Sequence, residues 1–247
     1  MKLSQRKAEN EIEHGKLLAE RDPELTWGWQ TPAGRLRAKR RASLIMAGAR
    51  VGAGKKVLEI GCGTGLFTEM FAQSGAQIIA VDISSELLEI ARKRCLPQDR
   101  VQFLEKRFED CVLDGPFDSV IGSSVLHHLE LEVALGRIYE LLKPGGSISF
   151  AEPNMSNPQV FLERKFRRFF PYVSENETAF VRWHFSKLLA RMGFEDVEIT
   201  PFDWLHPATP ERLIPIICTV GTYLEKTPIF LEFAGSLYIR GRRPLNS

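Results

Sequence analysis

The chain has 247 residues, with 33 basic against 31 acidic side chains, a formal net charge of +2 and 44% hydrophobic residues. This composition is close to the globular average, which excludes a disordered, collagen-like or coiled-coil chain. Charged residues interrupt every apolar stretch before about 18 residues, so we expect no membrane-spanning segment. The first ten residues have no apolar core and do not resemble a secretory signal, so we expect a cytoplasmic protein.

The four cysteines are widely spaced and form no C-x-x-C pair; they are Cys62, Cys95, Cys111 and Cys218. That spacing predicts neither a zinc site nor a disulfide framework. We expect reduced thiols and no bound metal.

The N-terminal part of the chain is basic. Residues 1–56 carry 13 Lys/Arg against 6 Asp/Glu, whereas the remainder carries 20 against 25. Thr31-Pro32 is typical of a helix start, and apolar residues at helical spacing predict a helix that continues to Ala49. The basic run at residues 35–41 then forms either the solvated face of this helix or a surface that attracts anions such as nucleic acid.

From residue 56 onward, short apolar runs alternate with stretches of helical periodicity. This rhythm predicts a mostly parallel sheet covered by helices on both faces, which is a doubly wound α/β fold. The expected strands lie at 56–60, 78–82, 101–104, 117–121, 147–151, 197–200 and 236–240. The expected helices between them lie near 66–71, 84–94, 131–142 and 186–192.

Two segments do not fit this alternation. Residues 153–178 are rich in aromatic and basic side chains, and residues 201–235 are rich in Pro, Leu and Ile. Ligands of open α/β sheets bind outside the carboxyl ends of the strands, where connections vary. We therefore predict a substrate-facing cap built from these two insertions, with an enlarged core as the alternative for the second.

A glycine-rich loop joins the first strand to its helix. The loop contains Gly61, Gly63 and Gly65 in a G-x-G-x-G pattern, with Glu59 two residues before it. Leu66 stands where a dinucleotide-binding loop needs its third glycine, and no Walker Gly-Lys-Ser/Thr follows. Because Asp82 ends the neighbouring strand and a carboxylate there can accept hydrogen bonds from a ribose diol, the pattern favours a nucleoside site.

These residues resemble the class I S-adenosylmethionine-dependent methyltransferases. The resemblance rests on VLEIGCGTG at 57–65, Val81-Asp82, FDSVIGSSVLHHL at 117–129, LLKPGG at 141–146 and GF at 193–194. It implies a seven-stranded Rossmann-like methyltransferase fold, divided into an N-terminal helical arm at 1–54 and a methyltransferase domain at 55–247 with the two cap insertions.

The resemblance also implies S-adenosyl-L-methionine as cofactor and S-adenosyl-L-homocysteine as product. Glu59 would hold the cofactor's ammonium group, Asp82 its ribose, and Ile83 its adenine. Arg107 replaces an acid common in relatives, which leaves the backbone of Phe108 as a contact for the adenine. The remaining positions implied in cofactor binding are Gly61, Cys62, Gly63, Thr64, Gly65, Ser123 and Ser124.

Catalytic groups are harder to identify, because methyl transfer from a sulfonium depends mainly on positioning. His128 is a candidate base with a suitable pKa range, and Glu152 could orient or deprotonate an acceptor. The alternatives are a packed histidine and a glutamate that binds adjoining backbone. Trp27, Trp29 and His184 are candidate substrate contacts, although the tryptophans could instead anchor the N-terminal arm and His184 could be a surface residue.

The expected function is methyl transfer to a small or lipid-like acceptor at oxygen, nitrogen or carbon. The alternatives are an RNA methyltransferase that uses the basic arm and a non-catalytic partner that only binds the cofactor. We expect a small-molecule acceptor rather than nucleic acid, and the aromatic and basic insertion leaves peripheral membrane contact open. The oligomeric state does not follow from the sequence.

Overall fold

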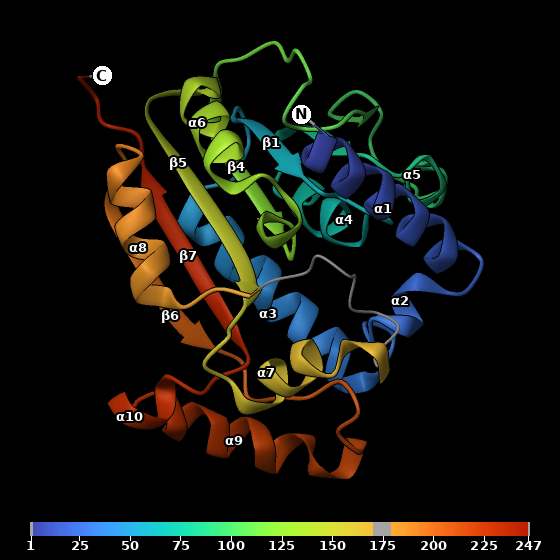
Figure 1. The fold of residues 1–247 in the computed structure, drawn as a ribbon, viewed down its shortest axis with the longest axis vertical. Helices are drawn as coiled ribbons and strands as arrows, with labels where there is room; N and C mark the ends of the chain where they lie inside the picture. The colour runs from blue at the N-terminus through green and yellow to red at the C-terminus, as the bar shows by residue number, and fades with distance from the viewer. Residues whose placement is uncertain (1, 170–178, 247) are drawn as a thin grey trace.

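The computed structural model describes residues 2–169 and 179–246, and within them a seven-stranded sheet forms the centre of the molecule (Figure 1). The strand order is β3-β2-β1-β4-β5-β7-β6. The strands are β1 (Lys56–Ile60), β2 (Gln77–Asp82), β3 (Val101–Glu105), β4 (Phe117–Ser123), β5 (Leu142–Pro153), β6 (Glu195–Phe202) and β7 (Ser236–Arg242). Neighbouring strands are parallel along the part of the sheet that runs β3-β2-β1-β4-β5, whereas β7 runs antiparallel to β5 and β6. This confirms the mostly parallel sheet predicted from the alternation.

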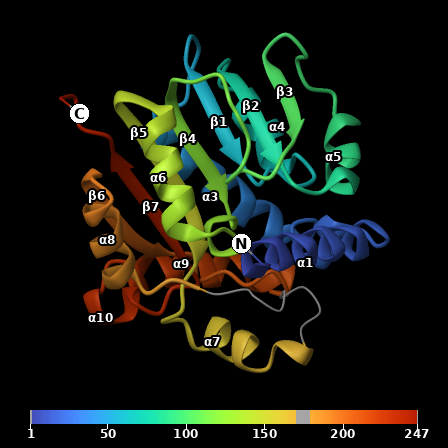
Figure 2. The same cartoon turned by 45° about the horizontal axis from the view of Figure 1, so that its top comes forward.

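Helices cover both faces of the sheet (Figure 2). Helices α6 and α8 pack on one face, and α3, α4 and α5 pack on the other. The longer helices are α1 (Lys2–Ala19), α3 (Pro32–Ala49), α4 (Leu66–Ala72), α5 (Ser85–Arg92), α6 (Leu131–Leu141), α7 (Pro158–Lys165), α8 (Arg182–Arg191) and α9 (Ile214–Leu224). Short turns complete the order: α2 (Pro23–Thr26), η1 (Leu126–His128), η2 (Arg167–Phe169), η3 (Glu211–Leu213) and α10 (Pro228–Leu231). The doubly wound arrangement is therefore confirmed.

Local sequence explains where the helices begin. Thr31 caps α3 because its Oγ1 accepts a hydrogen bond from the N–H of Gly34 at 2.9 Å, and Pro32 fills the first helical position. Ser84 caps α5 in the same way by accepting from the N–H of Leu87 at 3.3 Å. The cap at Thr31 agrees with the helix start predicted from Thr31-Pro32.

Helix α3 carries an unexpected charge into the core. Its apolar side packs on β4 and β5, with Ala38, Ala42 and Ile45 buried as expected. Arg41 lies on the same side, and only 3% of its surface is exposed. The basic run is therefore not simply a solvated helix face, because one of its guanidinium groups is enclosed beneath the carboxyl ends of the strands.

Strand register places the two insertions at one edge of the sheet. Pro153 at the end of β5 and Phe202 at the end of β6 both pair with Ser236 at the start of β7. The segments after β5 and β6 therefore leave the sheet at its carboxyl edge, beside the ends of β1 and β4. Residues 170–178 of the first predicted insertion lie outside the described residues. We keep the division at residue 54 and the cap assignment as proposals.

Candidate functional site

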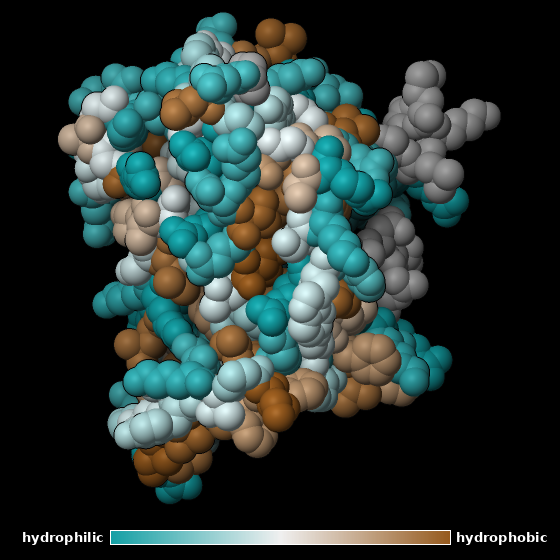
Figure 3. Space-filling model, turned by 90° about the vertical axis from the view of Figure 1, so that its left-hand side faces the viewer, coloured by the Kyte–Doolittle hydropathy of each residue, from teal (hydrophilic) through white to brown (hydrophobic). Residues whose placement is uncertain are grey.

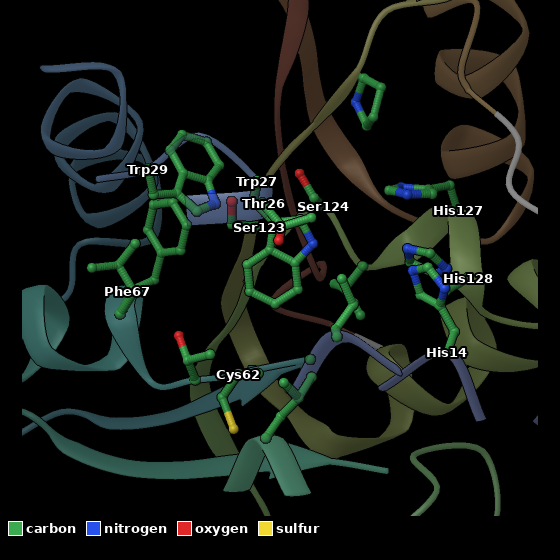
Figure 4. Close-up of a pocket in the computed structure, with 18 of the residues that line it drawn as sticks. His14, Thr26, Trp27, Trp29, Cys62, Phe67, Ser123, Ser124, His127 and His128 are labelled. Carbon is green, nitrogen blue, oxygen red and sulfur yellow. The ribbon is translucent and has the colours of Figure 1, made fainter. Parts of the chain in front are cut away.

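A cavity of about 960 Å³ lies outside the carboxyl ends of β1, β2 and β4. This is where the strand order reverses between β1 and β4, the place at which open α/β sheets bind their ligands. Figure 4 shows Trp29 and Phe67 on one side of the cavity and three histidines, His14, His127 and His128, on the other. Ligand pockets for drug-sized molecules measure about 300–1,000 Å³, so the volume is large enough for a cofactor together with a second molecule.

The glycine loop lines this cavity, and each of its glycines has a positive φ. The φ angles are +66° at Gly61, +50° at Gly63 and +74° at Gly65. A Cβ atom on Gly61 would lie 2.3 Å from Cγ2 of Val125, so this glycine lets β1 and the end of β4 approach closely. A Cβ on Gly63 would meet only Cη2 of Trp27, at 3.7 Å, because this glycine faces the cavity.

The residues between the glycines have different surroundings. Cys62 is buried and lines the cavity. Thr64 also lines it, and its Oγ1 donates a hydrogen bond at 2.7 Å to Oε1 of Glu24 from α2. Glu24 in turn pairs with Arg94, which ties the loop to the N-terminal segment.

Asp82 connects the end of β2 to the glycine loop. Its Oδ2 accepts a hydrogen bond from the N–H of Gly63 at 2.7 Å, and its Oδ1 accepts from the N–H of Ser84 at 2.9 Å. Burial raises the pKa of this carboxyl, and the backbone donors oppose the rise. A carboxylate offers about four lone-pair sites, so the two oxygens can still accept hydrogen bonds from a ligand diol. Ile83 lies beside it in the cavity wall.

Glu59 is buried behind the loop and does not line the cavity. Its Oε2 has no hydrogen-bond partner, and burial raises the pKa of the carboxyl to about 8. A buried polar atom without a partner costs free energy, so a cationic ligand group that reached Glu59 would stabilise the charged form. This is the acceptor chemistry expected for an ammonium contact.

Arg107 and Phe108 line the cavity beyond β3. The guanidinium of Arg107 lies 2.8 Å from Asp110 and 3.5 Å from Glu109, which holds it in a local ion-pair network. Phe108 is buried. Both residues thus form part of the cavity wall, and the contact of Phe108 with an adenine stays a prediction.

Arg41 holds the end of β4 in place. Its Nη1 donates to Oγ of Ser124 at 3.0 Å, to Oγ of Ser123 at 3.3 Å and to the carbonyl of Ala151 at 3.1 Å, and its Nη2 donates to Oγ of Ser236 at 2.6 Å. Ser124 has φ of +56°, a strained conformation for a residue with a side chain. Burial and the charge of Arg37 lower the pKa of Arg41 to about 10, so it stays charged at neutral pH.

Glu152 does not reach the cavity, which corrects the expectation that it acts on an acceptor. The residue is fully buried, and its Oε1 accepts hydrogen bonds at 2.9 Å from the N–H groups of Val125 and Leu126. Its Oε2 lies 2.5 Å from Nδ1 of His127. Burial raises the pKa of Glu152, but His127 and these backbone donors outweigh it and the net shift is downward. All three of these contacts go to η1 and to Val125 just before it, so its role is to position that turn.

His128 follows in the same turn and does line the cavity. Its Nδ1 lies 3.0 Å from Oε2 of Glu11, a residue of α1. The rings of His127 and His128 are 4.1 Å apart. Among the described residues, no group of three or more His, Cys, Asp and Glu side chains could hold a metal ion.

The three candidate substrate residues separate into two groups. Trp27 and Trp29 both line the cavity, and Trp29 packs edge-on against Phe67 with ring centroids 5.5 Å apart. His184 is exposed on α8 and does not line the cavity, so we do not retain it as a substrate contact. Helix α8 covers a face of the sheet and not its carboxyl edge, which is why the structure excludes His184.

Sequence reasoning missed the contribution of α1. Lys7, Glu11 and His14 line the cavity from this helix. The spacing i, i+4 and i+7 places these polar side chains on one helical face, and this was the available signal. Helix α1 approaches α5 closely at Gly15, where a Cβ atom would lie 2.6 Å from Oγ of Ser84.

The residues present fit an adenosyl cofactor with a methionine tail. Gly63 supplies a surface without a side chain, Asp82 supplies acceptors beside it, and Glu59 supplies a buried oxygen without a partner. Phe108 and Ile83 supply apolar contacts for a base.

Comparison with known proteins agrees with this fit. Residues 57–146 match a family model described as a methyltransferase domain. The chain is 34% identical over 140 residues to a ubiquinone biosynthesis O-methyltransferase from Xanthomonas campestris, a match that covers 55% of this chain and 58% of that protein. It is 36% identical over 115 residues to a demethylmenaquinone methyltransferase from Clavibacter sepedonicus, which covers 46% of each. The chain thus spans about half the length of the curated relatives it matches.

Two solved structures share the fold over almost the whole chain. An N-methyltransferase, NodS, from Bradyrhizobium japonicum in complex with S-adenosyl-L-homocysteine has a TM-score of 0.66 at 18% identity, covering 95% of this chain and 99% of that one. A methyltransferase from Thermotoga maritima, described as a possible histamine N-methyltransferase, has a TM-score of 0.64 at 20% identity, covering 93% and 99%. At these identities the likeness concerns the fold.

Proposed function

We propose that this chain is a class I S-adenosylmethionine-dependent methyltransferase that transfers a methyl group from S-adenosylmethionine to a hydroxyl group on a small or lipid-like acceptor. One observation carries the proposal. The glycine loop and Asp82 line the same cavity as Trp27 and His128, so groups suited to a cofactor and groups suited to an acceptor share one cavity.

The chain's own residues would bind the cofactor in a fixed orientation. Bound S-adenosylmethionine supplies an electrophilic methyl group on a sulfonium. Asp82 would accept hydrogen bonds from the ribose diol, and Gly63 would allow close approach of the backbone. Glu59, buried behind the loop, would attract the ammonium group from outside the cavity lining. Ser123 and Ser124, fixed by Arg41, line the cavity at the end of β4. Positioning of this kind provides most of the catalysis in an in-line displacement.

His128 is the candidate base. The carboxylate of Glu11 lies 3.0 Å from its Nδ1 without forming a hydrogen bond, and its negative charge favours a proton on that nitrogen, which would leave Nε2 able to accept a proton from the acceptor. Glu152 positions the turn through His127 and the backbone. A base at this position suits an acceptor that loses a proton on methylation, such as a hydroxyl group. An acceptor atom that carries no proton would not need the base.

The acceptor class follows from the cavity wall. Trp27, Trp29, Leu25 and Phe233 give the wall an apolar character, and the cavity extends beyond the glycine loop to α7. An acceptor with an apolar body would bury this surface. The names of the two relatives also support an apolar acceptor, since they refer to ubiquinone and menaquinone. The name of the Xanthomonas campestris relative specifies an O-methyltransferase, which supports an oxygen acceptor.

The structure gives no support to the RNA alternative. The RNA alternative requires that the basic side chains at residues 35–41 be free to contact RNA. However, Arg37 pairs with Asp203 at 2.7 Å, and Arg40 pairs with Glu225 at 2.5 Å. Arg41 is buried. Three of the basic side chains in this run thus interact with other parts of the fold. We therefore do not retain nucleic acid as the acceptor.

Two measurements test the proposal. Isothermal titration with S-adenosylhomocysteine should show binding, and Asp82→Ala should weaken it at least tenfold, whereas the matched surface variant Asp196→Asn should not. Incubation with methyl-tritiated S-adenosylmethionine and a panel of hydroxylated aromatic and prenylated compounds should label at least one acceptor. Absence of binding refutes the site, and binding without transfer to any hydroxyl compound in the panel favours the non-catalytic alternative.

A further inference from the structure

Helices α9 and α10 expose an unusual amount of apolar surface. Ile216, Val220 and Tyr223 on α9 are 60%, 49% and 68% exposed. Ile229 and Phe230 on α10 are 74% and 51% exposed. Figure 3 shows hydrophobic residues gathered at the lower end of the molecule, where α9 and α10 lie in Figure 1. We call these five side chains the α9–α10 face.

The composition of α9 makes this exposure notable. No charged residue occurs from Leu213 to Leu224, and a helix that is uncharged all round is normally buried. Here only Ile214 and Gly221 are buried. Gly221 sits against Trp204, where a Cβ atom would lie 3.1 Å from Cβ of the tryptophan, and this contact fixes which side of the helix turns outward.

Helix α7 and the turn η2 add aromatic and basic side chains. Phe161, Phe166 and Phe169 are 46%, 44% and 66% exposed. Nζ of Lys165 lies 5.8 Å from the ring centroids of Phe161 and Phe166, and the guanidinium of Arg168 lies 4.9 Å from that of Phe169. Basic side chains that run beside exposed aromatic rings are typical of segments lying at a membrane interface.

The charge around these elements is complementary to an anionic surface. Residues 158–169 contain four Lys/Arg and one Glu, which gives a net charge of +3. Near the α9–α10 face, Glu225 pairs with Arg40 and Glu232 pairs with Arg182, so these two carboxylates are neutralised. Anionic lipids attract such segments with about 1 kcal/mol per basic residue near the surface.

The exposed apolar surface is continuous with the mouth of the cavity. Phe233 follows α10, is 41% exposed, and lines the cavity. Nδ2 of Asn157, at the start of α7, donates a hydrogen bond at 2.7 Å to the carbonyl of Phe233. Val160 of α7 lines the cavity as well. The two exposed elements thus meet where the cavity opens.

We infer that α7–η2 and the α9–α10 face dock on the surface of an anionic phospholipid bilayer. The apolar side chains insert into the headgroup region, while Lys165 and Arg168 contact lipid phosphates. No described helix has the length and apolar character to cross a membrane, so this contact is peripheral. The inference goes beyond the proposed function, because bilayer docking needs neither cofactor nor methyl transfer.

Co-sedimentation with vesicles tests the docking surface. The full chain should bind vesicles of phosphatidylcholine with 30% phosphatidylglycerol and should bind pure phosphatidylcholine vesicles at least tenfold more weakly. The double variant Ile229→Ser/Phe230→Ser should bind the anionic vesicles about tenfold more weakly, because two inserted side chains are lost. The matched control Val112→Ser/Val133→Ser removes two exposed apolar side chains elsewhere and should bind like the wild type.

The basic part of the surface is tested separately. Lys165→Gln/Arg168→Gln should weaken binding to anionic vesicles by about fivefold per charge, as expected from 1 kcal/mol each. Lys187→Gln/Arg191→Gln on α8 is the control and should have no effect. Titration with S-adenosylhomocysteine should give unchanged affinity in all these variants, which separates failure of docking from failure of the cofactor site.

Three results would overturn the inference. The first is no binding of the wild type to anionic vesicles. The second is an equal loss of binding in the α10 variant and its control. The third is a wild-type dimer in light scattering that becomes a monomer in Ile229→Ser/Phe230→Ser, since the face would then be covered by a second copy of the chain.

Discussion

Replacement of Arg41 by methionine provides the sharpest test of how the carboxyl edge is built. The methionine keeps much of the side-chain volume but removes the hydrogen bonds to Ser123, Ser124, Ala151 and Ser236. Among the described residues, no carboxylate lies within ion-pair distance of the guanidinium; its Nη1 and Nη2 donate to neutral oxygens, and its Nε has no hydrogen-bond partner. The variant therefore measures the net value of a buried cation held by neutral acceptors.

The expected loss of stability can be worked out from these contacts. The carbonyl of Ala151 also accepts from the N–H of Ser124 at 2.8 Å, so it keeps a partner after the substitution. Three serine hydroxyls lose their donor, at about 1 kcal/mol each. The variant also no longer pays the free-energy cost of burying a charge, which offsets part of the loss of hydrogen bonds. We therefore expect the free energy of unfolding to fall by about 2–3 kcal/mol. For a chain of this size, Tm should fall by roughly 4–12 °C.

Thermal and urea unfolding of Arg41→Met should be compared with Arg40→Met. Arg40 makes an exposed ion pair with Glu225, and such pairs contribute about 0–1 kcal/mol. Arg41→Met should also weaken S-adenosylhomocysteine binding, because Ser124 loses the donor that holds its strained conformation. If Arg41→Met unfolds no earlier than Arg40→Met and binds with unchanged affinity, the guanidinium does not organise this edge.

The pKa of Glu59 is raised to about 8 from its ordinary 4.5, so the folded chain retains a proton that the unfolded chain loses between these values. Stability should therefore fall as pH rises from 4.5 to 8, and Glu59→Gln should flatten this dependence in urea titrations. Glu152→Ala should lower stability by about 3–5 kcal/mol, since it leaves buried donors of η1 and His127 without an acceptor; a loss below 1 kcal/mol would contradict this role. Gly63→Arg should abolish S-adenosylhomocysteine binding while circular dichroism stays unchanged, and retained affinity would mean that the loop does not contact the ligand. His128→Asn should reduce kcat at least 100-fold with little change in cofactor affinity, and an unaltered pH–rate profile would exclude it as the base.

The alternation of apolar runs was sufficient to predict the sheet. In the central strands β1 and β4 the buried positions are nearly contiguous in sequence, so burial on both faces can be recognised from the chain alone. The glycine loop and Asp82 were predictable for a related reason. Their chemistry is local, because a turn with positive φ and a carboxylate at a strand end are each specified by one or two neighbouring residues.

Contacts between distant segments were not predictable in this way. Glu11 and His128 are far apart in sequence and meet only because α1 crosses the cavity. Glu152 has the sequence context of an active-site carboxylate, yet the fold turns it toward η1.

The sequence by itself determined the strand–helix alternation, the loop geometry at Gly61 to Gly65 and the acceptor at Asp82. Only the tertiary structure decided that Arg41 is buried, that α1 forms part of the cavity wall, and that both insertions leave from the carboxyl edge. The physical reason is the range of the interactions. Backbone conformation and alternating burial are encoded by near neighbours, whereas the partner of a buried charge depends on which segments the strand order brings together.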